Sequence, residues 1–177
     1  SEMCIRDSGR YAAVCDYKTG SPKLSLNEIM EGLSLQLITY LLALSKTKST
    51  KDLLPAAMMY IYLHGRPKSM SVPPNGIPHA KEKENTNGIF LNDPDVLRTL
   101  DSQSGTDDGF IGVSYVKDGS VKKTSPVLTA EEFEALKALT EKILIRLYSR
   151  LESGEIAIHP VKNGTLSPCS YLSLIHI

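Results

Sequence analysis

Two apolar runs separated by a long amphipathic pattern constrain the fold of this chain more than any other feature. The first run predicts a strand over about residues 11 to 17, and the apolar spacing that follows predicts a helix over about residues 26 to 45. A second strand is predicted over about residues 55 to 63. Strand, helix and strand joined by a crossover of this length form a right-handed parallel or mixed unit. The sequence therefore predicts an α/β fold.

The helix starts in this chain carry recognisable signals. Ser25 with Glu28 three residues later predicts a capping box for the helix at 26 to 45. Thr129 with Glu132 predicts a second capping box, which opens the longest helix, ending near Leu151. Its apolar stripe has an ordinary width, so we assign the stripe to core packing and not to a partner-binding surface.

Two smaller elements are predicted between the second strand and the longest helix. Asp93-Pro94 begins a short helix to about Leu100, with the proline at the first helical position. Residues 110 to 116 and 121 to 123 predict a β-hairpin that turns at an Asp-Gly pair. The polar composition of residues 64 to 87 predicts a loop or insertion between these regions.

Composition restricts the class of protein without identifying it. The 177 residues suit one domain, with 41% hydrophobic and 23% charged residues and a net charge of zero. A neutral total counts mildly against DNA binding by this piece alone, unless a basic channel is shared with further domains. No uninterrupted apolar stretch reaches about 18 residues, and the three cysteines offer no disulfide framework. We expect a soluble, cytoplasmic protein with no membrane contact.

A polar motif closes the first strand. Asp16 and Lys18 are two residues apart, so on an extended strand their side chains point to the same face. A carboxylate can hold a divalent metal there while the ammonium holds a phosphate or water beside it, which is the chemistry of phosphodiester cleavage. Gln36 and Tyr40 are four apart and share a helix face. Alternatively, Asp16 and Lys18 are a solvated strand end and Gln36 is a surface residue.

These motifs resemble a known family. The segments DYKTG, GLSLQLITYL, LPAAMMYIYLHG, NGIFLNDPDVLRTLD and SGEIAIHPVKNGTLSPCSY occur in order from about Gly9 to Tyr171. They resemble the C-terminal nuclease domain of AddB subunits of bacterial AddAB-type helicase–nucleases, in the RecB-related branch of the PD-(D/E)XK superfamily. The resemblance implies a PD-(D/E)XK, restriction-endonuclease-like core over residues 9–171, with a mixed sheet flanked by helices and incomplete at both ends.

The resemblance also implies roles for individual residues. Asp16 matches the second acidic position of the family motif, a ligand of Mg²⁺, and the carbonyl of Tyr17 is a further candidate ligand. Lys18 matches the motif lysine, which orients the attacking water and offsets charge in the transition state. Gln36 and Tyr40 match the Gln-x-x-x-Tyr motif, expected to contact the DNA backbone or steady the lysine.

Both ends of the chain look foreign to this family. Residues 1–8 and 172–177 resemble translated sequencing-adapter read-through, and we expect them to make no contact with the core. The first acidic residue of the family motif belongs on a strand upstream of Asp16, in the region that residues 1–8 occupy. Asp7 is not assigned to that role. With one metal-binding carboxylate, this fragment is expected to bind Mg²⁺ poorly and to be inactive itself, whereas the parent protein is expected to be active.

Cys169, after Pro168, matches the first of three closely spaced cysteines that help to bind a [4Fe-4S] cluster in the family. The resemblance ends at Tyr171, before the next cysteine is expected. We therefore predict that Cys169 is a cluster ligand in the intact protein only.

Three functional hypotheses follow from the sequence. The favoured one is a Mg²⁺-dependent DNA exonuclease domain of a helicase–nuclease that processes double-strand breaks for recombinational repair, with DNA and an AddA-type subunit as partners. The second is a nuclease fold that binds DNA or a partner subunit without cutting, and the third is a generic α/β interaction domain. An upstream carboxylate in the complete gene would favour the enzyme.

Overall fold

The computed structural model of the protein describes residues 3–7, 11–20, 22–63, 86–106 and 109–155. Strands and helices are interspersed along these residues, as in other folds that combine helices with a sheet. The elements are β1 (Met3–Asp7), β2 (Tyr11–Lys18), α1 (Leu26–Met30), α2 (Gln36–Lys46), β3 (Leu54–Tyr62), β4 (Thr86–Leu91), α3 (Pro94–Leu100), β5 (Val127–Leu128) and α4 (Ala130–Glu152).

One mixed sheet, in the order β1-β2-β3-β4-β5, forms the centre of the described part of the chain. β2 and β3 are parallel, as the strand, helix, strand pattern predicts, and β1 is antiparallel to β2. β4 is antiparallel to β3 and parallel to the short β5. The mixed sheet flanked by helices that the sequence predicts is therefore confirmed.

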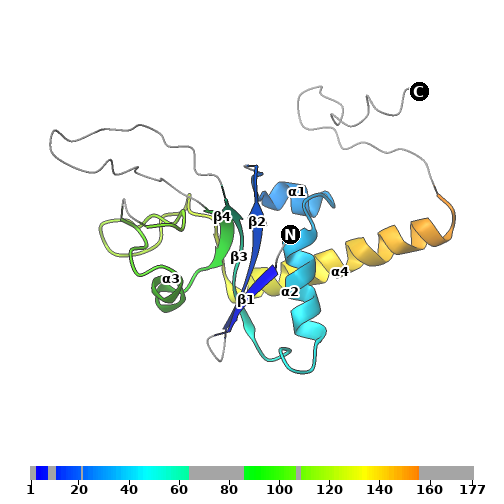
Figure 1. Ribbon diagram of the computed structural model, residues 1–177, viewed down its shortest axis with the longest axis horizontal. Helices are drawn as coiled ribbons and strands as arrows, with labels where there is room; N and C mark the ends of the chain where they lie inside the picture. Colours follow the sequence, from blue (N-terminus) through cyan, green and yellow to red (C-terminus); the bar gives the residue numbers. More distant parts are fainter. Residues whose placement is uncertain (1–2, 8–10, 21, 64–85, 107–108, 156–177) are drawn as a thin grey trace, which may run out of the picture.

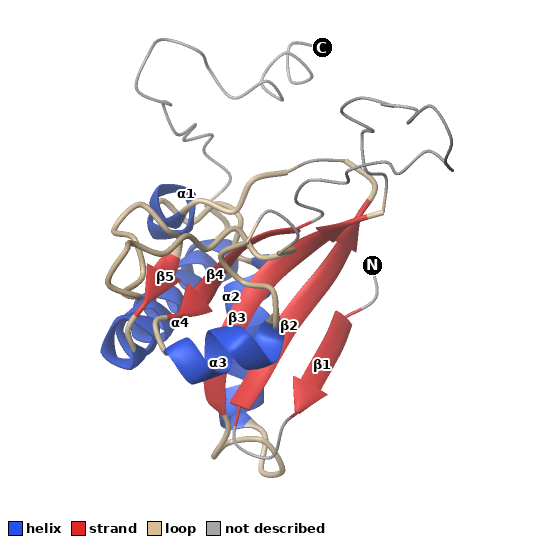
Figure 2. Cartoon of the chain, turned by 90° about the vertical axis from the view of Figure 1, so that its left-hand side faces the viewer, coloured by secondary structure: helices blue, strands red, loops and turns tan. Residues whose placement is uncertain are grey.

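Helices cover both faces of this sheet. α1, α2 and α4 lie on one side and α3 on the other, as the two perpendicular views in Figures 1 and 2 show. The inner strands are buried because both of their faces are covered. The fully buried side chains of the core include Val14, Leu37, Ile38, Ala57, Met58, Phe90, Leu97 and Phe133.

The predicted helix over residues 26 to 45 is in fact two helices, which corrects the sequence interpretation. α1 ends at Met30 and α2 begins at Gln36. Gly32 has φ +80° and Ser34 has φ +51°, and these left-handed conformations cannot continue a right-handed helix. The predicted capping box at Ser25 is also wrong, because the Ser25 side chain makes no capping hydrogen bond.

Strand β4 was not predicted, and its position requires a glycine. Gly88 pairs with Met59 of β3, and a Cβ atom on Gly88 would lie 2.5 Å from the Cβ atom of Met59. Any other residue would clash, so the glycine permits the close approach of the two strands. β4 thereby extends the sheet beyond the β2–β3 pair that positions Asp16.

The short elements near α3 follow their predicted signals in part. Asp93 caps α3 by accepting hydrogen bonds from the backbone N–H groups of Asp95 and Val96, at 2.9 and 3.2 Å, and Pro94 is the first helical residue, as predicted. The predicted hairpin over residues 110 to 123 is reduced to a single bridge between Tyr115 and Val121. The loop is instead stabilised by the buried carboxylate of Asp101, which accepts hydrogen bonds from backbone N–H groups of Gln103, Phe110 and Ile111.

The longest helix, α4, begins with the predicted capping box of Thr129 and Glu132. Phe133 and Leu136 in its first half are buried, so the core-packing interpretation is confirmed there. It is wrong for the second half, where Leu147 and Leu151 are exposed because the helix extends past the sheet (Figure 1). No helix in the described ranges is both long and apolar enough to cross a membrane.

The N-terminal residues also depart from expectation. Residues 1 to 8 were expected to make no core contact, yet Met3–Asp7 form β1 and pair with β2. Met3 is the register partner of Asp16, and Asp7 is the partner of Ala12 at the other end of β2. The β1–β2 pairing is made by backbone hydrogen bonds, which need no particular side chains.

Candidate active site

The candidate site is built around a carboxylate at the end of β2. Asp16 follows the buried run Ala12 to Cys15 and is itself only 1% exposed, because β1 and β3 flank it on both sides. Neither of its carboxylate oxygens accepts a hydrogen bond from the residues that the structure describes. A buried carboxylate that is compensated by a single cation is costly to keep, and such groups cluster at functional sites.

Lys18 lies beside this carboxylate. Its Nζ atom is 2.7 Å from Asp16 Oδ2, an ion-pair distance, and the side chain keeps 29% of its surface exposed. The same ammonium donates a hydrogen bond of 3.0 Å to Gln36 Oε1. Lys18 therefore connects the Asp16 carboxylate of β2 to Gln36 of α2. Part of the Lys18 side chain remains open to solvent.

Gln36 and Tyr40 complete a chain of contacts from the sheet into α2. Gln36 is the first residue of α2, and its Nε2 atom donates a hydrogen bond of 3.2 Å to the Tyr40 hydroxyl one turn later. The structure thus brings Asp16, Lys18, Gln36 and Tyr40 together, as the family resemblance implies. Their catalytic roles stay predictions.

The break between α1 and α2 determines where Gln36 lies. Ser34, in its left-handed conformation, donates a hydrogen bond of 2.7 Å from Oγ to Glu28 Oε2. Glu28 therefore stabilises the turn before α2 instead of capping α1, which was its predicted role. Because the turn ends just before Gln36, this side chain comes from the first turn of a new helix and reaches Lys18.

Sequence reasoning missed Tyr60 as a member of the site. Tyr60 is the register partner of Asp16 on β3, is 4% exposed, and has its ring centroid 5.2 Å from Lys18 Nζ. Burial raises the pKa of its hydroxyl, Lys18 opposes this by lowering the pKa, and Asp16 and Glu28 add smaller increases. The sequence analysis placed Tyr60 only within the strand predicted over about residues 55 to 63, which is no signal for a site.

The remaining predicted ligands are less well supported by the geometry. Tyr17 lies half-buried on β2 between Asp16 and Lys18, and the role of its carbonyl as a ligand stays a prediction. Cys169 lies outside the described residues. Within the part of the chain that the structure describes, no group of three or more Asp, Glu, His or Cys side chains could hold a metal ion. Asp7 is four positions along the ladder from Asp16, consistent with leaving it unassigned.

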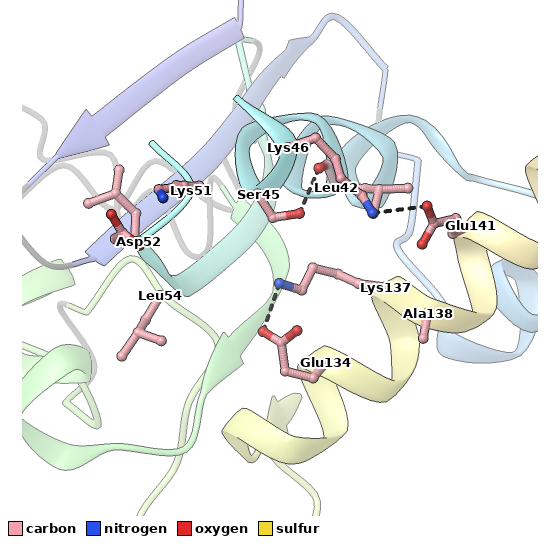
Figure 3. Close-up of a pocket in the computed structure, with 11 residues that line it drawn as sticks. Leu42, Ser45, Lys46, Lys51, Asp52, Leu54, Glu134, Lys137, Ala138 and Glu141 are labelled. Atoms are coloured by element: carbon pink, nitrogen blue, oxygen red, sulfur yellow. Dashed lines mark hydrogen bonds and ion pairs between the residues drawn. The ribbon is translucent and has the colours of Figure 1, made fainter. Parts of the chain in front are cut away.

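A separate cleft of about 480 Å³ lies between α2, α4 and the loop before β3 (Figure 3). Its charged residues are largely paired, Lys46 with Glu141 at 3.0 Å and Lys137 with Glu134 at 2.7 Å. Leu54, which lines it, begins β3, whereas Tyr60 is near the end of that strand. The cleft is therefore at the opposite end of the parallel strands from Asp16 and is not part of the candidate site.

A strand that ends in a buried Asp and a Lys, joined to a helical Gln and Tyr, is the arrangement that the sequence resemblance implies for a nuclease. The sequence profile of the PD-(D/E)XK nuclease superfamily matches residues 4–174, and the chain belongs to this superfamily.

Longer bacterial proteins share this sequence. The chain is 33% identical over 172 residues to an ATP-dependent helicase/deoxyribonuclease subunit, of the AddB type, from Desulforamulus reducens, covering 91% of this chain and 14% of the relative. Subunits of the same name from Desulforudis audaxviator and Clostridium kluyveri are 29% and 32% identical, over 96% and 91% of this chain and 15% of each relative. The chain thus spans about 15% of the length of these curated relatives.

Proposed function

We propose that the protein from which this chain comes is a Mg²⁺-dependent DNA exonuclease within a helicase–nuclease that processes double-strand breaks for recombinational repair. The observation that carries the proposal is the buried Asp16 carboxylate, which accepts no hydrogen bond from the described residues and lies 2.7 Å from Lys18. Superfamily membership supports nuclease chemistry, and the names of the relatives support DNA as the substrate.

The residues present fit a magnesium ion in part. Mg²⁺ prefers hard oxygen ligands, often one or two carboxylates with water and substrate phosphate making up the rest. Asp16 offers a carboxylate whose Oδ1 atom has no hydrogen-bond partner among the described residues while Oδ2 faces Lys18, and the Tyr17 carbonyl is the second candidate. Mg²⁺, when bound, supplies a Lewis acid that stabilises charge on the phosphate.

Lys18 performs the part of the chemistry that the chain itself supplies. An ammonium has three N–H donors, and here one is given to Gln36 while another faces Asp16. The remaining donor, on a side chain that is 29% exposed, is free to orient the attacking water or to offset charge on the phosphate. Gln36 and Tyr40 act by holding Lys18 in place or by contacting the DNA backbone.

A second carboxylate is expected on the strand before Asp16 in the parent protein. Met3 is the backbone register partner of Asp16 in the antiparallel β1–β2 pair. We propose that this is the position of the missing acidic ligand. This chain, with Met3 there, is expected to bind Mg²⁺ poorly and to cleave little DNA or none.

The intact protein is proposed to work with a partner subunit and a cluster. The relatives are each one subunit of a helicase/deoxyribonuclease, which supports an AddA-type partner. Cys169 would be one ligand of a [4Fe-4S] cluster there. The cysteines that complete it would lie beyond Tyr171, so the intact protein would be brown with absorbance near 400 nm, roughly as expected of four-thiolate iron ligation.

The test uses the complete open reading frame, purified with its motor subunit. Asp16→Ala is expected to abolish Mg²⁺-dependent degradation of linear DNA and to leave ATP hydrolysis nearly intact, because the metal and the motor are separate sites. Loss of both activities would point to a structural role for Asp16. An intact gene with no carboxylate upstream of Gly9 would favour the alternative, a nuclease fold that binds DNA or a partner without cutting.

A further inference from the structure

Tyr60 is the one aromatic side chain recorded against the Lys18 ammonium within the described residues. Lys18 Nζ lies 5.2 Å from the centroid of its ring. At separations up to about 6 Å, the negative face of an aromatic ring attracts a cation. Asp16 and Gln36 hold the same nitrogen at 2.7 and 3.0 Å. The position of the ammonium is therefore defined by three partners from β2, α2 and β3.

The sheet fixes Tyr60 more firmly than the lysine. Tyr60 is 4% exposed and is paired on one side with Asp16 of β2 and on the other with Asn87 of β4. Lys18, by contrast, carries its ammonium on a flexible four-carbon stem and is partly exposed. A rigid ring beneath a flexible cation restricts where that cation can lie.

The three tyrosines near the site, Tyr40, Tyr60 and Tyr62, differ in whether the hydroxyl or the ring makes the contact with a neighbouring residue. The Tyr40 hydroxyl accepts a hydrogen bond from Gln36, and the Tyr62 hydroxyl donates one of 2.6 Å to the carbonyl of Pro22. No hydrogen bond joins the Tyr60 hydroxyl to another described residue. At Tyr60 the contact with the site is made by the ring, whose face lies toward the Lys18 ammonium.

We propose that Tyr60 is a positioning residue that acts through Lys18, with its ring holding the ammonium between Asp16 and Gln36. The catalytic consequence rests on the proposed function, whereas the contact itself does not. Tyr60 would then limit turnover without touching the substrate, because a displaced Lys18 cannot orient the attacking water.

Nuclear magnetic resonance of the 177-residue chain tests the contact directly. The Lys18 ε-methylene signal is identified by its loss in Lys18→Met. We expect this signal to be shifted upfield by the Tyr60 ring and to show nuclear Overhauser contacts to the ring protons. Tyr60→Phe should keep both effects and Tyr60→Leu should remove them. A Lys18 signal at its unfolded position in the wild-type chain, with no contact to Tyr60, would overturn the proposal whether or not Tyr60→Leu folds.

A double-mutant cycle separates positioning from core packing. Lys18→Met and Tyr60→Leu, singly and together, should show a coupling of about 2- to 5-fold in the unfolding equilibrium constant, the range expected of a cation over a ring. Tyr115→Leu is the matched control, since Tyr115 is also partly buried but its hydroxyl pairs with Ser104 in the region after α3, so it should combine additively with Lys18→Met. Additivity for Tyr60 as well would mean that it only fills the core.

The complete protein then tests the consequence. Tyr60→Leu should lower the single-turnover cleavage rate about 3- to 30-fold with little change in DNA affinity. If the wild-type protein does not cleave DNA, the proposed function fails, but the resonance and coupling data still decide the Lys18–Tyr60 contact. If it cleaves and Tyr60→Leu matches the wild-type rate, the positioning role fails while the nuclease assignment stands.

Discussion

Asp16 and Asp101 are both almost fully buried, at 1% and 6% exposure, yet their surroundings are opposite. Asp101 Oδ2 accepts hydrogen bonds from the backbone N–H groups of Phe110 and Ile111, at 2.7 and 3.2 Å. Its Oδ1 accepts one of 3.0 Å from the backbone N–H of Gln103. Asp16 accepts none from the described residues and has only the ion pair with Lys18. Asp101 therefore stabilises a loop, whereas the Asp16 carboxylate is available to bind a ligand.

The difference shows how a structural carboxylate can be told from a functional one. Backbone donors around Asp101 repay the cost of removing its charge from water. At Asp16 the compensation comes from one ion pair with Lys18, whose side chain is partly exposed, so we expect the fold to lose less than at Asp101 if the charge is removed. Burial alone therefore does not identify a site, whereas burial with missing hydrogen-bond partners does.

The largest expected effect comes from the same substitution at both positions. Asp101→Asn removes the charge that three N–H groups share and turns an amide donor toward some of them, so we expect a loss of about 2–3 kcal/mol in the free energy of unfolding. Asp16→Asn should change it by less than about 1 kcal/mol, because Lys18 is partly exposed and can be rehydrated. Urea unfolding of both variants measures this. Equal losses would remove the distinction between the two carboxylates.

A gain of metal binding is the next largest effect. Met3→Asp should place a second carboxylate opposite Asp16, and Mg²⁺ at about 10 to 30 times its dissociation constant should then stabilise the chain by about 1.4–2 kcal/mol. Thermal unfolding with and without Mg²⁺ measures the change. Met3→Asn and the double variant Met3→Asp with Asp16→Asn are the controls, and both should be insensitive to Mg²⁺. Stabilisation of either control to the same extent would refute the paired site.

Smaller effects are expected along the chain of contacts in α2. Gln36→Leu loses hydrogen bonds to both Lys18 and Tyr40, and we expect a loss of about 1 kcal/mol in unfolding free energy, with about half of that for Tyr40→Phe. Tyr148→Phe is the matched control, because Tyr148 also bonds a residue four positions away but is 61% exposed. It should be near neutral. An equally large loss at Tyr148 would show that the Gln36 contacts are ordinary surface hydrogen bonds.

The smallest effect concerns alkaline pH. Burial raises the pKa of the Tyr60 hydroxyl, and burial followed by the charge on Tyr60 raises the pKa of Tyr62. Above about pH 10 the unfolded chain ionises these groups while the folded chain does not, so stability should be full below pH 10 and fall as pH rises through the folded pKa values. Substitution of both tyrosines by Phe should flatten this fall, as measured by unfolding between about pH 9 and 11. An unchanged slope would contradict the assigned shifts.

Local signals in the sequence predicted much of the fold. The apolar period predicted β2 and β3, and the capping box at Thr129 predicted the start of α4, because each depends on residues within a few positions of one another. The break between α1 and α2 was not predictable in this way. The apolar spacing continues across it, and Ser34 adopts a left-handed conformation that is unusual for a residue other than glycine.

The candidate site was predicted where spacing along the chain determines it. Asp16 with Lys18, and Gln36 with Tyr40, are pairs whose separations place them on one face of a strand or helix. Tyr60 was missed because its position beside Asp16 depends on the register between β2 and β3, and register is a long-range property. The pairing of β1 was missed for a different reason, because residues 1–8 were interpreted as foreign sequence and no strand was predicted there.

Single-turnover cleavage by the complete protein, with Asp16→Asn and Asp101→Asn compared in the same assay, tests the central claim most directly. We predict that Asp16→Asn brings DNA cleavage below detection while the protein stays folded and hydrolyses ATP, because the carboxylate that would hold Mg²⁺ is lost. Asp101→Asn should be less stable but should cleave at the wild-type rate per folded molecule. Wild-type cleavage by Asp16→Asn would contradict the account.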